Sequence, residues 1–173
     1  PDRIEEAAQR LAAAERPFLF AGKGVLWSEA SAAFVELGEH LGAAMSTTLG
    51  ARGAVPEDHP NYFHIADGET LAAVRNDADV VLVVGARLGE YDGWGMPPAW
   101  GDPGGQFTIH LDSDPMSIGL NRPVDLAIVA DARQALELDV VLLVVANAPW
   151  QKVGSRTVSP AEDRLAMVRA AVA

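Results

Sequence analysis

The chain has 173 residues, a formal net charge of -11 and 49% hydrophobic residues. This length suits one folded domain with a buried core. An acidic chain without a Lys/Arg run is unsuited to binding nucleic acid or an anionic membrane. Cysteine is absent, which excludes disulfides, thiol catalysis and cysteine-ligated zinc. No apolar run approaches the roughly 18 residues of a membrane span and no signal-peptide pattern is present, so we expect a cytoplasmic protein.

Strand-like and helix-like segments alternate along the chain. Short apolar runs bounded by Gly, Pro or Asp predict strands over 18–21, 43–48, 80–84, 107–111 and 126–130. Apolar spacing and capping patterns predict helices over 4–14, 28–41 (with Ser28 as N-cap), 69–76 and 159–172, a short helix from Pro115 and another starting at 131. By composition the run 140–145 fits a strand, although the helix starting at 131 could continue through it.

Apolar strands without two-residue alternation, separated by helices, are typical of a parallel sheet covered on both faces. Right-handed crossovers then predict a doubly wound, Rossmann-like α/β fold. We expect this nucleotide-binding type of domain over residues 1–146, followed by a linker and a C-terminal helix over 147–173. Trp94 and Trp100 lie in a Gly/Pro-rich loop, where they would be exposed and suit a subunit interface, or pack within the loop.

Acidic residues follow two predicted strands. Asp112 and Asp114 come after the strand 107–111, and Asp131 follows the next one. Open α/β sheets bind ligands at the carboxyl ends of their strands, where carboxylates can accept hydrogen bonds from ribose hydroxyls or an adenine amino group. The pattern therefore predicts a nucleotide site. Asp114 also stands where a helix cap is expected, and Asp112 and Asp114 have no third ligand nearby, so we predict no metal site.

Glycines and basic residues stand at other strand ends. Gly22, Lys23 and Gly24 form a turn whose backbone could approach a phosphate, although the third glycine of the dinucleotide fingerprint is missing. Lys23, Arg52 and Arg87 each follow a predicted strand, where a cation could meet an anionic ligand. Taken singly, each of these features also fits a tight turn or a surface charge.

Taken in chain order, these segments resemble the central domain of thiamine diphosphate-dependent enzymes of the acetolactate synthase, oxalyl-CoA decarboxylase and benzoylformate decarboxylase group. The matching segments span about residues 4–140 and comprise 16–25, 48–60 with its Pro-x-x-His-Pro motif, 78–88, 110–121 and Asp131. The resemblance implies a six-stranded parallel sheet with helices on both faces, the DHS-like NAD/FAD-binding fold. It also implies that residues 140–145 belong to a helix.

The resemblance further implies a nucleotide site built from five strand ends. The turn after the first strand would face the nucleotide, and the turn after the second strand would face the flavin side. The turn after the third strand would contact the diphosphate or ribose, and the two acids would contact the adenosine half. These residues are Gly22, Lys23, Gly24, Thr48, Leu49, Gly85, Arg87, Asp112 and Asp131. Flavin-binding members carry three glycines where Lys23 takes the middle place here, so FAD, ADP and an empty site remain open.

The resemblance implies a parent enzyme that decarboxylates a 2-oxo acid and joins the carbanion to an acceptor, using thiamine diphosphate and magnesium. The Gly-Asp-Gly and Asn-Asn motifs that hold this cofactor are absent from the chain, so we expect no catalytic residue here. We expect one domain of a longer enzyme, in contact with its other domains within a homodimer or homotetramer. The alternatives are a stand-alone nucleotide-binding module, similar to NAD-dependent deacylases or electron-transfer flavoproteins, or a structural domain with an empty crevice.

Overall fold

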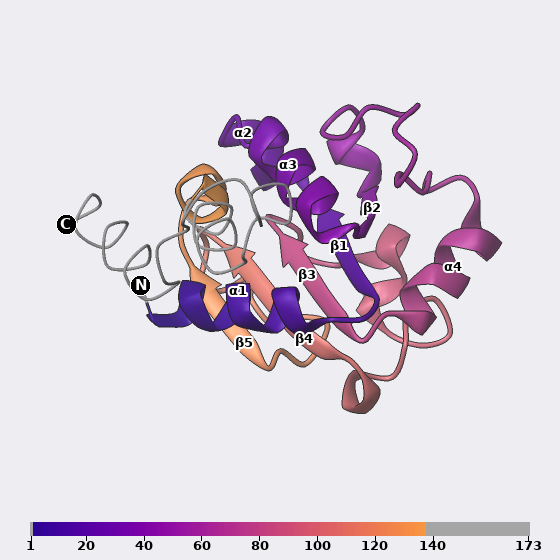
Figure 1. Cartoon of the computed structure of the whole chain (residues 1–173). Helices are drawn as coiled ribbons and strands as arrows, with labels where there is room; N and C mark the ends of the chain where they lie inside the picture. The colour runs from indigo at the N-terminus through magenta and orange to yellow at the C-terminus, as the bar shows by residue number, and fades with distance from the viewer. Residues whose placement is uncertain (1, 138–173) are drawn as a thin grey trace, which may run out of the picture.

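A computed structural model describes residues 2–137, in which helices cover both faces of one parallel sheet (Figure 1). The sheet has the order β2-β1-β3-β4-β5 with every neighbouring pair parallel, and its strands are β1 (Pro17–Ala21), β2 (Ala44–Thr47), β3 (Val80–Val84), β4 (Phe107–Asp112) and β5 (Leu126–Val129). This confirms the doubly wound α/β fold. The expected sixth strand is not found within residues 2–137. The predictions for 140–145 and 147–173 lie outside the described residues.

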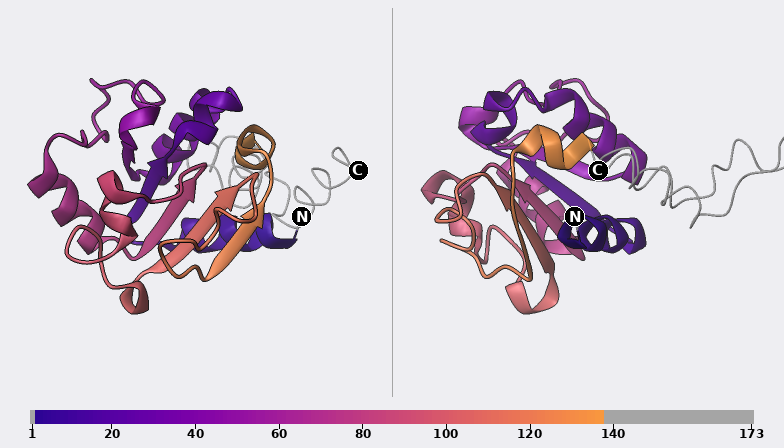
Figure 2. Two further views of the ribbon diagram at one scale, coloured as in Figure 1. Left: turned by 180° about the vertical axis from the view of Figure 1, so that it is seen from behind. Right: turned by 90° about the vertical axis from the view of Figure 1, so that its left-hand side faces the viewer.

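The helices lie on two sides of the sheet. The α-helices are α1 (Asp2–Ala13), α2 (Lys23–Trp27), α3 (Ser31–Leu41) and α4 (Gly68–Asp77), and the short 3-10 turns are η1 (Leu49–Ala51), η2 (Glu90–Gly95) and η3 (Pro103–Gly105). A further helix begins at 132. Side chains of α1 and α3 pack on one face, and those of α4 and the segment after β3 pack on the other. Figure 2 shows the ribbons of these segments on the two sides of the sheet. None of the helices in residues 2–137 is long and apolar enough to cross a membrane.

Side chains of alternate strand residues pack into two separate hydrophobic clusters, one on each face of the sheet. In β1, Leu19 joins the cluster under α1 and α3, whereas Phe18 and Phe20 join the cluster under α4. Every residue of β1 and β3 is buried. This two-sided burial explains why these strands are uniformly apolar in sequence.

The expectation of an exposed Trp100 is wrong. Its side chain is fully buried, packs edge-on against Phe18 and Phe20 at centroid distances of 5.9 and 5.1 Å, and donates from Nε1 to the Asp92 carbonyl at 2.6 Å. The alternative of packing within the loop therefore holds for Trp100. Trp94 is half exposed.

Two predicted helix boundaries also differ from the structure. The helix predicted over 28–41 begins at Ser31 as α3, and the separate short helix α2 precedes it, because Ser28 ends α2 and Glu29 takes a left-handed conformation (φ 54°) between the two. The Ala30 N–H donates to the Val25 carbonyl at 2.8 Å, which closes α2 and turns the chain. The segment from Pro115 forms turns instead of a short helix.

Candidate nucleotide site

The strand order reverses direction between β1 and β3. From β1 the chain crosses through α3 to β2, and then returns through α4 to β3 on the other side of β1. In doubly wound sheets this switch point opens a crevice at the carboxyl ends of the two central strands. The turn that follows β1 and the turn that follows β3 both lie there, and each contains predicted site residues.

These two turns are in direct contact through their glycines. The Gly22 N–H donates to the Val84 carbonyl at 2.8 Å, and the Gly24 N–H donates to the Gly85 carbonyl at 3.1 Å. A Cβ on Gly22 would overlap the Gly85 carbonyl oxygen, and a Cβ on Gly24 would lie 2.7 Å from the Gly85 Cα. Here the glycines serve close backbone approach, and their N–H groups are engaged within the protein. A phosphate at this point could not use these two N–H groups, but it could still meet cationic side chains.

Lys23 and Arg87 supply such side chains. Lys23 belongs to the first turn and Arg87 lies just beyond the second, and both are exposed. Within residues 2–137 neither forms an ion pair with a carboxylate. The other basic side chains of this region are engaged: Arg16, Arg52 and Arg133 in ion pairs, Arg75 and Arg122 by burial, Arg3 with the Ala127 carbonyl and Arg10 over the Phe107 ring.

The turn after β2 stands beside the first glycine turn. The Thr48 N–H donates to the Ala21 carbonyl at 2.8 Å, which ties the ends of β1 and β2 together. Leu49 is more than half exposed. The aliphatic part of Lys23 reaches this turn, because a Cβ on Gly50 would overlap the Lys23 Cε and lie 3.2 Å from its Cγ. The structure thus brings together the predicted residues of the first and second turns.

Two polar residues that were not among the predicted contacts make hydrogen bonds near the ends of β3 and β4. Asn121 donates from Nδ2 to the Arg87 carbonyl at 2.8 Å. His110 is buried, and its Nδ1 accepts from the Gly119 N–H at 3.4 Å. Burial lowers the pKa of His110, although the Asp112 carboxylate opposes this shift. His110 could have been singled out in the sequence, because it is a polar residue inside an otherwise apolar strand. Asn121 lies in a loop, where a polar residue gives no such signal.

The three acids all make local hydrogen bonds. Asp112 accepts from the Asp114 N–H at 2.9 Å, and Asp114 accepts from the Met116 N–H at 3.0 Å and the Ser117 hydroxyl at 2.9 Å. Asp114 therefore caps the turn that follows β4. Asp112 stays partly exposed at the end of the strand.

Asp131 starts the helix after β5. Its Oδ1 accepts from the Arg133 and Gln134 N–H groups at 3.0 and 3.2 Å. The Ser28 hydroxyl lowers the pKa of Asp131. The Arg133–Glu29 ion pair at 3.6 Å joins this helix to the turn that follows α2. Asp131 thus has a structural role beside its predicted contact with adenosine.

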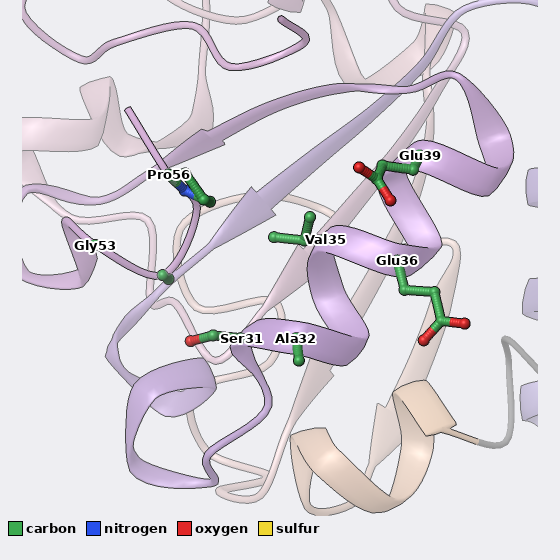
Figure 3. A pocket seen from close by; sticks show the side chains of 8 residues that line it. Ser31, Ala32, Val35, Glu36, Glu39, Gly53 and Pro56 are labelled. Carbon is green, nitrogen blue, oxygen red and sulfur yellow. The ribbon is translucent and has the colours of Figure 1, made fainter. Parts of the chain in front are cut away.

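A separate groove lies between α3 and the segment after η1 (Figure 3). It is lined by Ser31, Ala32, Val35, Glu36, Glu39, Gly53, Ala54 and Pro56. None of the predicted nucleotide contacts lines this groove. Within residues 2–137, no three His, Asp or Glu side chains are grouped so that they could hold a metal ion.

Comparisons with known proteins place this arrangement in a family. The model of the thiamine pyrophosphate enzyme central domain matches residues 4–138. Acetolactate synthase from Mycobacterium avium is 36% identical over 155 residues, which are 85% of this chain and 24% of that protein. A 2-hydroxyacyl-CoA lyase from Oryza sativa subsp. japonica is 34% identical over 153 residues, which are 85% of this chain and 25% of that protein.

The solved structures agree with this assignment. The thiamine diphosphate-dependent 4-hydroxybenzoylformate decarboxylase from Rhodococcus jostii is similar at a TM-score of 0.63 and 29% identity, over 80% of this chain and 26% of that one. The chain spans about a quarter of the length of the curated relatives that it matches. It belongs to the thiamine pyrophosphate enzyme family, whose central domain it contains.

Proposed function

We propose that this chain serves as the central domain of a thiamine diphosphate-dependent 2-oxo acid decarboxylase or carboligase of the acetolactate synthase type, and that it binds an adenine nucleotide, FAD or ADP, at the β1/β3 switch point. One observation carries the nucleotide proposal. Lys23 and Arg87, at the two contacting glycine turns, are exposed and lack a carboxylate partner within residues 2–137. In a chain of net charge -11, such cations are suited to an anionic ligand.

The residues of this chain do not fit thiamine diphosphate itself. The Gly-Asp-Gly and Asn-Asn motifs expected for that cofactor are absent from the sequence, and the described residues offer no grouped metal ligands. We therefore assign thiamine diphosphate and magnesium to other domains of the parent enzyme. The role of this domain is to hold the nucleotide and to contact those domains within a homodimer or homotetramer.

A thermal-shift series tests the nucleotide site. The 173-residue chain is heated with ADP, FAD or NAD at millimolar concentration. A nucleotide present at 100 times its Kd stabilises the folded chain by about 2.7 kcal/mol, which raises the Tm by roughly 5–10 °C in a domain of this size. We expect this rise with ADP or FAD. If no nucleotide raises the Tm, the proposed site is refuted.

Matched arginine variants locate the binding. Arg87→Ala removes the cation beside the second glycine turn and should abolish the shift. Arg16→Ala removes another half-exposed arginine, which precedes β1 at the opposite end of the strands and should leave the shift intact. Equal shifts in the two variants would contradict the assignment of Arg87 to the diphosphate.

A decarboxylation assay tests the division of labour between domains. The isolated 173-residue chain is incubated with a 2-oxo acid, thiamine diphosphate and Mg²⁺, and the release of CO₂ is measured. We expect no release above the rate without protein, because the chain offers no site for the cofactor. Turnover by the isolated chain would show that our assignment of catalysis to other domains is wrong.

A further inference from the structure

We infer that the carboxyl edge of the sheet, where the five strands end, is the face that docks another domain of the parent enzyme. Tyr91 and Trp94 anchor this interface. It rests on the proposed function, because it needs a parent enzyme with further domains, and it adds which face of this domain meets them.

The exposed large hydrophobic side chains are concentrated at this edge. Within residues 2–137, each of them is the last residue of a strand or lies in the segment that follows one. Tyr91 and Trp94 follow β3, Met116 and Leu120 follow β4, and the other three lie in α2, in η1 and at the end of β5. In the same part of the chain, the short segments that lead into the strands expose no side chain of this kind. Such a concentration on one face marks an interaction surface.

Buried residues hold the loop after β3 in place from beneath. Trp100 donates from Nε1 to the Asp92 carbonyl at 2.6 Å, and the Asp92 carboxylate accepts from the Gly89 N–H at 3.2 Å. Arg122 donates to the Gly95 carbonyl at 2.5 Å. Trp100, Asp92 and Arg122 are all buried. Because the core fixes this loop, little conformational freedom is left to lose when a partner binds it.

The two aromatic side chains project from this fixed loop. Tyr91 is 82% exposed and Trp94 is 52% exposed. Trp94 takes a left-handed conformation (φ 56°), which is unfavourable for a residue with a side chain and persists only where the surroundings enforce it. Tyr and Trp held rigidly at a surface are the residues that most often dominate binding energy in protein interfaces.

The segment after β4 extends the same surface. Asn121 donates from Nδ2 to the Arg87 carbonyl at 2.8 Å, so this segment lies beside the start of the loop after β3. Met116 is 79% exposed and Leu120 is 62% exposed. The apolar surface is therefore contributed by two segments in contact and does not depend on one loop alone.

A domain of the parent enzyme is the occupant that size and extent support. The chain spans about a quarter of the length of its curated relatives, so most of a parent of that length lies outside it. Covering Trp27, Tyr91 and Trp94 alone would bury about 400 Å², roughly half of what one partner contributes to a stable interface. A nucleotide at the switch point would cover the ends of β1 and β3, whereas the exposed side chains follow all five strands.

Hydroxyl-radical footprinting, measured by mass spectrometry, compares the 173-residue chain with the full-length parent enzyme, both without added nucleotide. We expect Tyr91, Trp94 and Met116 to be oxidised several-fold more slowly in the parent enzyme, because the facing domain excludes solvent from them. The internal control is His40, which is exposed in the last turn of α3 before β2 and should react equally in both proteins. Equal oxidation of Tyr91 and Trp94 in the two proteins would overturn the inference and leave the nucleotide site standing.

Substitutions in the full-length parent enzyme test the two anchors. Tyr91→Ser combined with Trp94→Ser should raise the oxidation of Met116 to the level of the 173-residue chain, whereas His40→Ser should leave it unchanged. Circular dichroism of each variant checks that it is folded. Unchanged slow oxidation of Met116 in the double variant would refute the role of the anchors.

Two further outcomes separate this interface from its alternatives. Sedimentation of the 173-residue chain should show a monomer. A dimer in which Tyr91 and Trp94 are already protected would make a second copy the occupant and overturn the inference. A parent reading frame without further domains would refute the proposed function and this interface with it.

Discussion

A buried arginine holds the loop that covers the α4 face of the sheet. Arg122 is 1% exposed, and its guanidinium donates to the Thr108 hydroxyl at 3.0 Å and to the Gly95 and Gly101 carbonyls at 2.5 and 3.1 Å. It also donates to the Gln106 side-chain oxygen at 2.8 Å. No carboxylate lies within ion-pair distance of it in the described residues. Arg122 thus acts as a multidentate donor, and burial lowers its pKa.

Arg122→Met is expected to destabilise the fold severely. The change leaves four buried acceptors without this donor, and an unsatisfied buried polar group costs about 1–3 kcal/mol. Relief from burying a charge offsets part of this cost, so we expect a net loss of about 3–5 kcal/mol of unfolding free energy. The whole free energy of unfolding of a typical domain is only about 5–15 kcal/mol. Arg122→Lys should lose nearly as much unfolding free energy, because a lysine ammonium group lacks the planar guanidinium geometry that lets one side chain donate to four acceptors.

Urea unfolding followed by tryptophan fluorescence measures this loss. The indole of Trp100 lies 5.8 Å from the Arg122 guanidinium carbon and reports on the same loop. The control is Arg16→Met, at a half-exposed arginine with ion pairs to Glu15 at 3.0 Å and Asp77 at 3.3 Å, which should cost less than about 1 kcal/mol. If Arg122→Met costs no more than this control, or if Arg122→Lys is as stable as the unsubstituted chain, the reasoning from buried acceptors is refuted.

Two further substitutions probe the candidate site. Gly22→Ala places a Cβ on the Gly85 carbonyl oxygen, so it should lower the free energy of unfolding in urea by at least about 2 kcal/mol. The control is Gly68→Ala, whose Cβ meets nothing within 4 Å and which should change that free energy by less than about 1 kcal/mol. Burial lowers the pKa of His110 below the ordinary histidine value of about 6.5. As the pH falls through this range, the unfolded chain binds more protons than the folded chain, so the free energy of unfolding falls. The urea midpoint should therefore drop between pH 7.5 and 5.5, and drop less in His110→Gln; equal drops would contradict this account.

Much of the fold followed from local patterns. The apolar runs placed all five observed strands to within two residues at either end, because a strand buried on both faces must be apolar throughout. The family could likewise be named from short segments in order along the chain, and the comparisons confirm it. The boundary near Ser28 was missed, because the left-handed turn at Glu29 depends on how α2 packs and leaves no mark in the spacing of apolar residues.

By itself, the sequence determined which segments form the five strands and most of the helices, and which glycines and cations follow the strands. It also showed that the thiamine diphosphate motifs are absent. Only the tertiary structure decided what these residues touch. Gly24 meets Gly85, Lys23 rests on Gly50, and Trp100 lies in the core. The physical reason is that burial and hydrogen-bond partners depend on contacts between segments far apart in the chain. Local spacing can place a residue at a strand end, but the packing of neighbouring turns decides which of its groups remain available to a ligand.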